Sequence, residues 1–281
     1  MPALLLGALL TFSVADADRA YETAKVLAET CSPRDAGTPA ATRAANFILD
    51  HASAVGADVR LDRFTADTPR GKKNFVNLYA EFCSNPTGRW VVVCSHYDTK
   101  SGVRSQGAND GASTAGLLIG FTQSLVDWHT PHGNVILLWL DGEECMESYG
   151  ENDGLWGSRH AAARLKASGR DIRSVICVDM LGDRDLSIGI PKNGTPGLKK
   201  IALYAAKKEG LADLVSLSGD VVRDDHLPFL EAGFMAIDLI DFEYGPSNAY
   251  WHSEEDTVDK ISRESIHKSG RLLARLVGLL L

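Results

Sequence analysis

Short apolar runs recur along the chain and predict the buried strands of a sheet. Runs without polar interruption are typical of strands covered on both faces, and they span residues 90–94, 135–140, 175–178 and 236–240. Residues 58–64 alternate between apolar and polar side chains as a half-buried strand does, and residues 74–82 continue the sheet. A further short strand is expected over residues 185–190.

The segments between these runs have helical spacing. Apolar residues repeat at helical intervals in 40–55, and Gly210 directly after the amphipathic stretch 198–209 is a helix C-cap signal. The predicted helices cover residues 18–30, 40–55, 112–125, 158–167, 198–209, 227–232 and 261–281. Strands that alternate with helices predict an α/β fold with a mostly parallel sheet covered on both faces, where ligands bind at the carboxyl ends of the strands.

Length, composition and charge narrow the class of protein. The 281 residues, 44% of them apolar, suit a single globular domain with a substantial core. The net charge of −8 and the scattered basic residues argue against nucleic acid or an anionic membrane as a partner. No stretch reaches the ~18 apolar residues of a membrane span. The oligomeric state is left open.

The N-terminus resembles an export signal. The apolar run Leu4–Leu10 is followed by Ala15, Asp16 and Ala17, the pattern of a hydrophobic region and a small-residue cleavage site. No lysine or arginine precedes the run, and a buried first helix segment is the alternative interpretation. We expect residues 1–17 to be a signal peptide or its remnant, residues 18–281 to be one enzyme domain, and the protein to be exported to the periplasm or secreted.

Cysteine spacing excludes one kind of metal site. The five cysteines form no Cys-x-x-Cys pair, so a cysteine-rich zinc site is not expected. Cys94 and Cys177 fall inside apolar strands and are expected to be small core residues. Cys83 and Cys94 could meet if their strands were adjacent.

Ionisable residues gather where the apolar runs end. Glu143 and Glu144 follow the run 135–140 through a glycine turn, and a half-buried strand end is a costly place for paired negative charge unless a cation lies there. His96, Asp98 and Asp179 lie at or just past the ends of other runs, and Asp110 and His252 fall in loops that follow such runs. Imidazole and carboxylate groups are ligands that suit zinc. The sequence therefore predicts a zinc enzyme.

Each group also has a plainer interpretation. Asp110 lies in a tight Gly-Ala-Asn-Asp-Gly context and could be a helix N-cap, as could one of the acids in Asp224-Asp225-His226. His96 and Asp98 share one face of an extended segment, so either His96 binds a metal and Asp98 orients it, or both are structural. Of the two glutamates, one can bind the metal while its neighbour acts as a general acid and base.

These motifs, in this order, resemble the zinc exopeptidases related to the di-zinc aminopeptidases, from about residue 20 to the C-terminus. The resemblance implies a three-layer α/β/α sandwich with a mixed, mostly parallel central sheet. The acidic loop after Glu144, the Leu155–His160 segment and the Asp224–Phe229 motif look like the glutaminyl cyclase branch. That branch implies Asp110, Glu144 and His252 as zinc ligands, Glu143 as the proton shuttle, and Asp179 and Asp224 in a supporting hydrogen-bonded network.

Three features depart from the animal cyclases. Tyr149 stands where they carry a tryptophan at the mouth of the pocket, and Arg223 stands where they have a glutamine. Ser95 and Ala115 occupy the places of their cysteine pair. These departures concern the substrate pocket, which we expect Trp251, Tyr149 and Arg223 to line, and the disulfide content.

The leading hypothesis is a glutaminyl-peptide cyclotransferase, which converts the N-terminal glutamine of peptides and proteins to pyroglutamate and releases ammonia. The alternative is an aminopeptidase with a second zinc ion on His96 and Asp179, bridged by Asp110, in which Glu143 activates water. A non-catalytic binding module on the same fold would be expected to have lost a ligand or Glu143, and none of these is missing.

Overall fold

A mixed eight-stranded sheet forms the centre of the computed structural model, which describes residues 9–128 and 133–281. The order across the sheet is β1-β2-β4-β3-β5-β8-β6-β7. Strands β4, β3, β5 and β8 run parallel to one another, whereas β1, β2 and the β6–β7 pair run antiparallel to their inner neighbours. The strands are β1 Val59–Thr68, β2 Gly71–Cys83, β3 Trp90–His96, β4 Asn134–Leu140, β5 Ile172–Asp179, β6 Ile188–Ile190, β7 Val215–Leu217 and β8 Ala236–Ile240.

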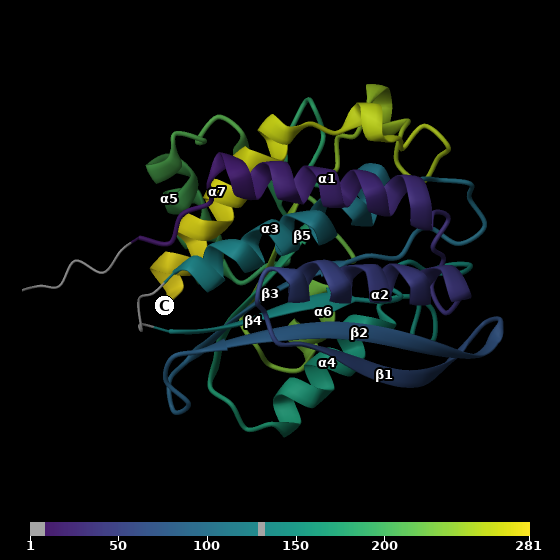
Figure 1. Cartoon of the computed structure of the whole chain (residues 1–281), viewed down its shortest axis with the longest axis horizontal. Coiled ribbons are helices and arrows are strands. Elements are labelled where there is room, and N and C mark those ends of the chain that lie inside the picture. The colour runs from purple at the N-terminus through teal and green to yellow at the C-terminus, as the bar shows by residue number, and fades with distance from the viewer. Residues whose placement is uncertain (1–8, 129–132) are drawn as a thin grey trace, which may run out of the picture.

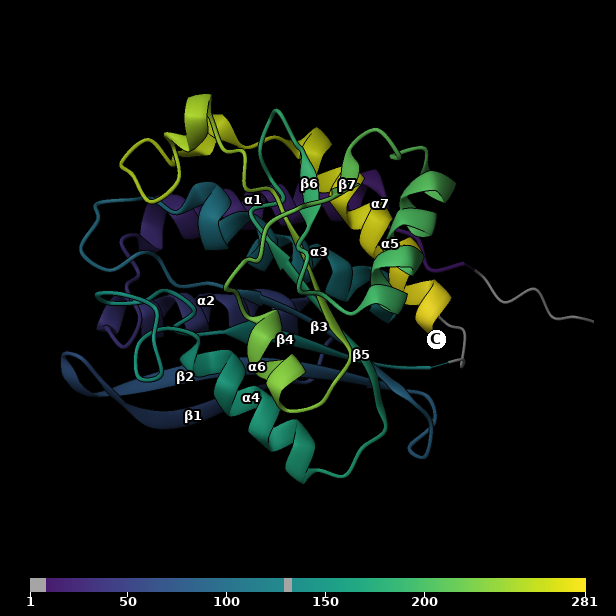
Figure 2. The same cartoon turned by 180° about the vertical axis from the view of Figure 1, so that it is seen from behind.

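Helices cover both faces of this sheet. On one face, seen in Figure 1, lie α1 Val14–Cys31, α2 Pro39–Ala54, α3 Thr114–Asp127, α5 Pro196–Glu209 and α7 Arg263–Leu280. The other face, which Figure 2 turns toward the viewer, carries α4 Trp156–Ala167 and α6 His226–Glu231. The three-layer α/β/α sandwich expected from the sequence is confirmed.

The two cores follow from the side-chain alternation of the inner strands. Val91 and Val93 of β3 pack into the core beneath α1, α2, α3 and α7, while Val92 and Cys94 of the same strand face α4 and α6. Successive side chains of a strand point to opposite faces. A strand buried on both faces must therefore be apolar throughout, which is why uninterrupted apolar runs identified β3, β4, β5 and β8.

The strand order corrects one expectation about the cysteines. Strand β4 lies between β2 and β3, so Cys83 and Cys94 are not on adjacent strands. Cys94 is instead paired in register with Cys177 of β5, with 3.0 Å between their sulfur atoms. All five cysteines carry free thiols.

Helix α1 spans the position of the domain boundary expected at residue 18. Most of the apolar run Leu4–Leu10 lies outside the described residues, but Leu10 and Phe12 are buried in the core. Ser13 caps α1 and exchanges hydrogen bonds with Asp16 in a capping box. A boundary between residues 17 and 18 therefore falls inside α1, and export stays a prediction. Within the described residues, no helix combines the length and the apolarity that a membrane crossing requires.

Helices α1 and α3 approach closely through two glycines of α3. A Cβ atom on Gly116 would lie 2.4 Å from the Ala20 carbonyl oxygen, and one on Gly120 would lie 2.5 Å from the Asp16 carbonyl oxygen. Both contacts are with backbone atoms that can move only if α1 moves. The glycines therefore set the distance between the two helices.

We predict opposite effects for two glycine-to-alanine substitutions. Gly116→Ala should lower the free energy of unfolding by about 1–3 kcal/mol because α1 must shift. Gly278→Ala is the matched control, because its Cβ atom would lie 4.0 Å from the nearest atom, Leu10 Cβ. This substitution should stabilise α7 by roughly 0.5–1 kcal/mol. Urea unfolding of both variants checks this. Equal effects of the two substitutions would contradict the packing argument.

Candidate active site

The ionisable residues predicted from the sequence meet at the carboxyl edge of the parallel strands. His96 is the last residue of β3 and Asp179 the last residue of β5. Glu143 and Glu144 follow β4 through Gly142, which has a φ of 77°. His252 lies in the loop after β8, also with a positive φ of 52°. Non-glycine residues seldom adopt a positive φ, and those that do are concentrated at functional sites.

Asp110 reaches this edge from an irregular turn ahead of α3. The turn, η1 Ala108–Ser113, is distorted at Asp110 and at Gly111, whose φ is 92°. A Cβ atom on Gly111 would lie 2.7 Å from the Asp98 carbonyl oxygen, so only glycine lets the turn press against the end of β3. The two carboxylate oxygens of Asp110 face His96 and His252, which favours the metal-ligand interpretation of Asp110 over the helix N-cap.

The three predicted zinc ligands lie together. His252 Nε2 is 2.8 Å from Glu144 Oε1 and 3.4 Å from Asp110 Oδ2. One ligand atom from each residue lies within 4.8 Å of the others. Ligand atoms around a tetrahedral zinc ion, each about 2.0–2.2 Å from it, are themselves about 3.3 Å apart. The spacing of Asp110, Glu144 and His252 therefore fits zinc.

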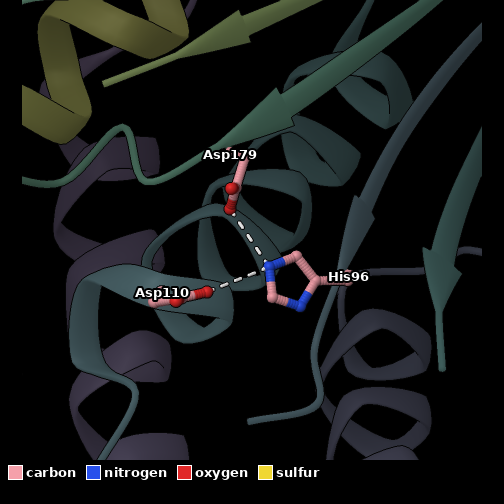
Figure 3. Close-up of side chains that lie close together, drawn as sticks. All are labelled: His96, Asp110 and Asp179. Atoms are coloured by element: carbon pink, nitrogen blue, oxygen red, sulfur yellow. Dashed lines mark hydrogen bonds and ion pairs between the residues drawn. The ribbon is translucent and has the colours of Figure 1, made fainter. Parts of the chain in front are cut away.

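A second group shares Asp110 with the first. His96 Nε2 lies 3.2 Å from Asp110 Oδ1 and 3.1 Å from Asp179 Oδ1 (Figure 3). The two oxygens of Asp110 thus face two different histidines. These are the residues that the aminopeptidase hypothesis required for a second metal ion.

The electrostatics of the first group also call for a cation. Glu144 is buried beside Asp110, and burial together with this neighbouring charge raises the pKa of Glu144 to about 7. Burial alone would lower the pKa of His252, but its hydrogen bond to Glu144 raises it overall. A divalent cation removes the repulsion between the two carboxylates and restores the ionised form of Glu144. The donor set of one imidazole and two carboxylates suits zinc.

Two buried side chains hold the Asp110 turn in place. The guanidinium of Arg34, fully buried, donates to the carbonyl oxygens of Gly107 at 2.7 Å and Gln106 at 2.6 Å, and to that of Tyr97 at the end of β3. Asp256 accepts the backbone N–H groups of Asn109 at 2.8 Å and Asp110 at 3.1 Å. The turn is therefore held through its carbonyl groups on one side and its N–H groups on the other.

Asp98 positions the two glutamates rather than only His96. Its carboxylate accepts the backbone N–H of Glu143 at 3.1 Å and that of Glu144 at 3.2 Å. His96 Nδ1 lies 3.5 Å from the same carboxylate. Asp98 therefore links the ends of β3 and β4, as a residue behind the metal ligands would.

Glu143 is the carboxyl best suited to carry a proton. Burial raises its pKa well above the usual range, and the charges of Glu144 and Asp224 raise it further. The Tyr149 hydroxyl lies 3.0 Å from both Glu143 oxygens and donates to that carboxylate. Tyr149 was expected only to line the pocket. The hydrogen bond to Glu143 is a contact that the sequence did not predict. Asp224 is also buried, with a raised pKa, and lies close enough to influence Glu143.

Sequence reasoning missed three residues of the site. Arg34 sits in a turn between α1 and α2, and Asp256 sits in the loop that follows His252. Lys100 Nζ donates to the Cys145 carbonyl oxygen at 2.7 Å and lies 3.9 Å from Glu144 Oε2. Nothing in the local sequence marks them, because each acts on a segment far away along the chain.

A third buried group contains residue types that bind metals, but the tautomer of its histidine is unsuited to a metal ion. Asp224, His226 and Asp238 offer atoms within 4.8 Å of one another. The Asn193 side-chain oxygen accepts the Val222 N–H, and its Nδ2 donates to the Val222 carbonyl oxygen, which fixes the orientation of the amide. The same Nδ2 donates to His226 Nε2 at 2.9 Å. The proton of a neutral His226 must then sit on Nδ1, which leaves no lone pair for a metal. We assign no metal to this group.

A cavity of about 600 Å³ opens onto the site. The candidate catalytic and metal-binding residues Asp110, Glu143, Glu144, Asp179, Asp224 and His252 all line it. So do Tyr149, Arg223 and Trp251, the residues expected to contact substrate. The Trp251 ring stacks on His252 with 3.9 Å between ring centres. The cavity therefore joins every predicted group except His96 and Asp98, which lie behind it.

Comparison with known proteins shows the family to which the chain belongs. The model of "Peptidase family M28" matches residues 77–277. The chain belongs to peptidase family M28. Within that family it groups with the glutaminyl cyclases: the crystal structure of a glutaminyl cyclase from an Acidobacteriales bacterium is 34% identical, with a TM-score of 0.88, over 100% of this chain and 98% of the other.

Two further relatives of this M28 chain bear on its activity and its fold. A glutaminyl-peptide cyclotransferase of Bos taurus is 26% identical over 278 residues, which cover 84% of this chain and 75% of the bovine protein. A leucine aminopeptidase precursor from Bacteroides thetaiotaomicron has a TM-score of 0.84 at 23% identity over 97% of this chain and 99% of the other. At that identity the likeness shows the fold alone.

We predict that Asp256→Asn weakens metal binding. The asparagine turns one acceptor oxygen into an NH₂ group that faces a backbone N–H, so the Asp110 turn loosens. Zinc affinity should fall by roughly 10–100-fold, as measured by competition with a chelator. The matched control is Asp259→Asn on the exposed part of the same loop. Equal affinities for the two variants would contradict the role of Asp256.

We also predict that zinc stabilises the protein more at about pH 8 than at about pH 5.5. The raised pKa of Glu144, about 7, means that its stabilising protonated form is present at low pH and is lost as the pH rises through 7. At low pH, protons therefore compete with zinc. Melting temperatures with and without zinc at both pH values test this. An equal shift at both would contradict it.

Proposed function

We propose that the protein is a zinc-dependent glutaminyl-peptide cyclotransferase that converts the N-terminal glutamine of peptides to pyroglutamate and releases ammonia. The observation that carries the proposal is a buried Glu143, with a pKa raised by burial, beside the Asp110, Glu144 and His252 group in one cavity. The glutaminyl cyclase structure whose alignment covers almost the full length of both proteins supports it.

The reaction needs an electrophilic carbonyl and a proton carrier. A zinc ion held by Asp110, Glu144 and His252 would supply a Lewis acid for the side-chain amide carbonyl of the substrate. Glu143 takes a proton from the attacking α-amine and returns it to the departing ammonia. A carboxyl with a raised pKa suits this exchange near neutral pH.

Neighbouring residues assist Glu143 in this proposal. The hydroxyl of Tyr149 fixes the orientation of the Glu143 carboxylate through its hydrogen bond. Asp224 adds to the effect of burial in raising the pKa of Glu143, and burial together with the charge of Asp179 raises the pKa of Asp224. Trp251, stacked on His252, provides a flat apolar wall for the methylene groups of the substrate glutamine.

An exported enzyme would meet peptide and protein N-termini outside the cytoplasm. We propose export on the N-terminal pattern of residues 4–17, with a folded domain that begins before residue 14, since Leu10 and Phe12 are buried. These N-termini are the only partners that the proposal requires.

The second candidate function is a two-metal aminopeptidase. The specific observation in its favour is the His96, Asp110 and Asp179 group, which could hold another ion beside the first. Metal analysis of the zinc-loaded protein separates the two. Near one zinc ion per chain is expected for the cyclase, whereas near two ions per chain would favour the peptidase.

We predict that Glu143→Gln lowers the rate of ammonia release from an N-terminal glutamine peptide by at least about 100-fold, because an amide cannot take up and return the proton. Zinc content should stay that of the wild type, since Glu143 is not one of the three ligands. The control is Glu147→Gln, four residues further along and exposed. Wild-type turnover in Glu143→Gln would refute the role.

A further inference from the structure

Two cysteines occupy facing positions on neighbouring strands in the middle of the sheet. Cys94 of β3 is paired in register with Cys177 of β5, and both side chains belong to the core that these strands share with α4 and α6. Neighbouring strands lie ~4.7–4.9 Å apart, and a disulfide joins residues whose Cα atoms are ~4.4–6.8 Å apart. The backbone therefore already has the spacing that a disulfide requires.

The sulfur atoms of this pair point toward each other. They are 3.0 Å apart, which leaves no room for another atom between them. The bond length of a disulfide is ~2.05 Å, so the two sulfur atoms need to approach by only about 1 Å. A small rotation about the Cα–Cβ bond of each cysteine supplies that movement without moving either strand.

The structure selects this pair among the five cysteines. All five lie within the described residues, and Cys94 and Cys177 are the two whose sulfur atoms contact each other. Cys83, by contrast, is exposed at the end of β2. The pair also differs from the cysteine pair of the animal cyclases, whose places are taken here by Ser95 and Ala115.

Burial determines when a bond between these two thiols can form. Cys94 is fully buried and Cys177 is 1% exposed, so an oxidant in solution does not reach them in the folded protein. Burial also raises the pKa of both thiols, and the folded protein therefore holds little of the reactive thiolate. The thiols are accessible only while α4 and α6 have not yet packed on β3 and β5.

We propose that Cys94 and Cys177 are oxidised to a disulfide when the chain folds in the presence of a disulfide oxidant. The thiolate of one cysteine attacks the oxidant, which releases one thiol and leaves a mixed disulfide. The thiolate of the other cysteine attacks the protein sulfur of that mixed disulfide, forms the Cys94–Cys177 bond and releases the second thiol. The protein loses two electrons and two protons, and the oxidant is reduced to two thiols.

The bond joins the strand ends that carry two residues of the site. His96 follows Cys94 by two positions, and Asp179 follows Cys177 by two. Residues two apart lie on the same face of a strand, so the disulfide lies next to the His96–Asp179 contact of 3.1 Å. It also restricts the unfolded chain between positions that are 83 residues apart. The oxidised protein is therefore the more stable form.

The test refolds the full chain from denaturant, once with oxidised and reduced glutathione and once with reduced glutathione alone. Free thiols are then alkylated in denaturant and counted by mass spectrometry. We expect three of the five cysteines to be alkylated after oxidative refolding, with one peptide pair joined through Cys94 and Cys177, and all five after reductive refolding. Five alkylated cysteines in both samples, or a link through another cysteine, would overturn the proposal.

The matched control is Cys83→Ala, which removes an exposed thiol outside the pair and should keep the Cys94–Cys177 link. Loss of the link in this control would overturn the selection of the pair. The oxidised wild type should melt roughly 5 °C or more above the reduced wild type, whereas Cys94→Ala should melt at one temperature after both refoldings. Equal melting of the two wild-type samples would overturn the stabilising role. Ammonia release plays no part in this test, so its outcome is independent of the proposed function.

Discussion

The burial of several carboxylates at one sheet edge is the constraint on which the rest of the site depends. Asp110, Glu143 and Glu144 are each at most 6% exposed and lie close enough to raise one another's cost of ionisation. Arg34 brings one compensating charge from behind the Asp110 turn, and the remaining repulsion favours either protons or a metal ion. The fold thus gives neighbouring glutamates different surroundings: Glu144 lies beside Asp110 and His252 and is suited to a cation, whereas Glu143 accepts a hydrogen bond from Tyr149 and has a pKa raised by burial.

Much of the fold and of the site could be predicted because the informative signals are local. Strands buried on both faces produce apolar runs, and the polar residue that ends such a run must lie at the sheet edge, which located His96, Glu143 and Asp179. What escaped prediction depends on distant contacts. Arg34 meets Gly107 only because α1 and the Asp110 turn pack together, and the pairing of Cys94 with Cys177 depends on a strand order that places β3 beside β5. The three-residue strand β7 is too short to leave a pattern.

Cyclase and aminopeptidase chemistry draw on nearly the same side chains here. Asp110 offers one oxygen to the His252 group and the other to His96, so the ligand set alone does not choose between one ion and two. The proposed choice comes from what surrounds Glu143. Glu143 is oriented by Tyr149, and burial together with the charges of Glu144 and Asp224 raises its pKa, which suits taking a proton from the α-amine and returning it to departing ammonia.

The most direct test of this account is mass spectrometry of a peptide mixture incubated with the zinc-loaded protein. Half of the peptides begin with glutamine and half with leucine. Loss of ammonia from the glutamine peptides alone, with every peptide keeping its full length, is the result that the account predicts. Stepwise release of free amino acids from the N-termini would contradict it and would make the protein an aminopeptidase.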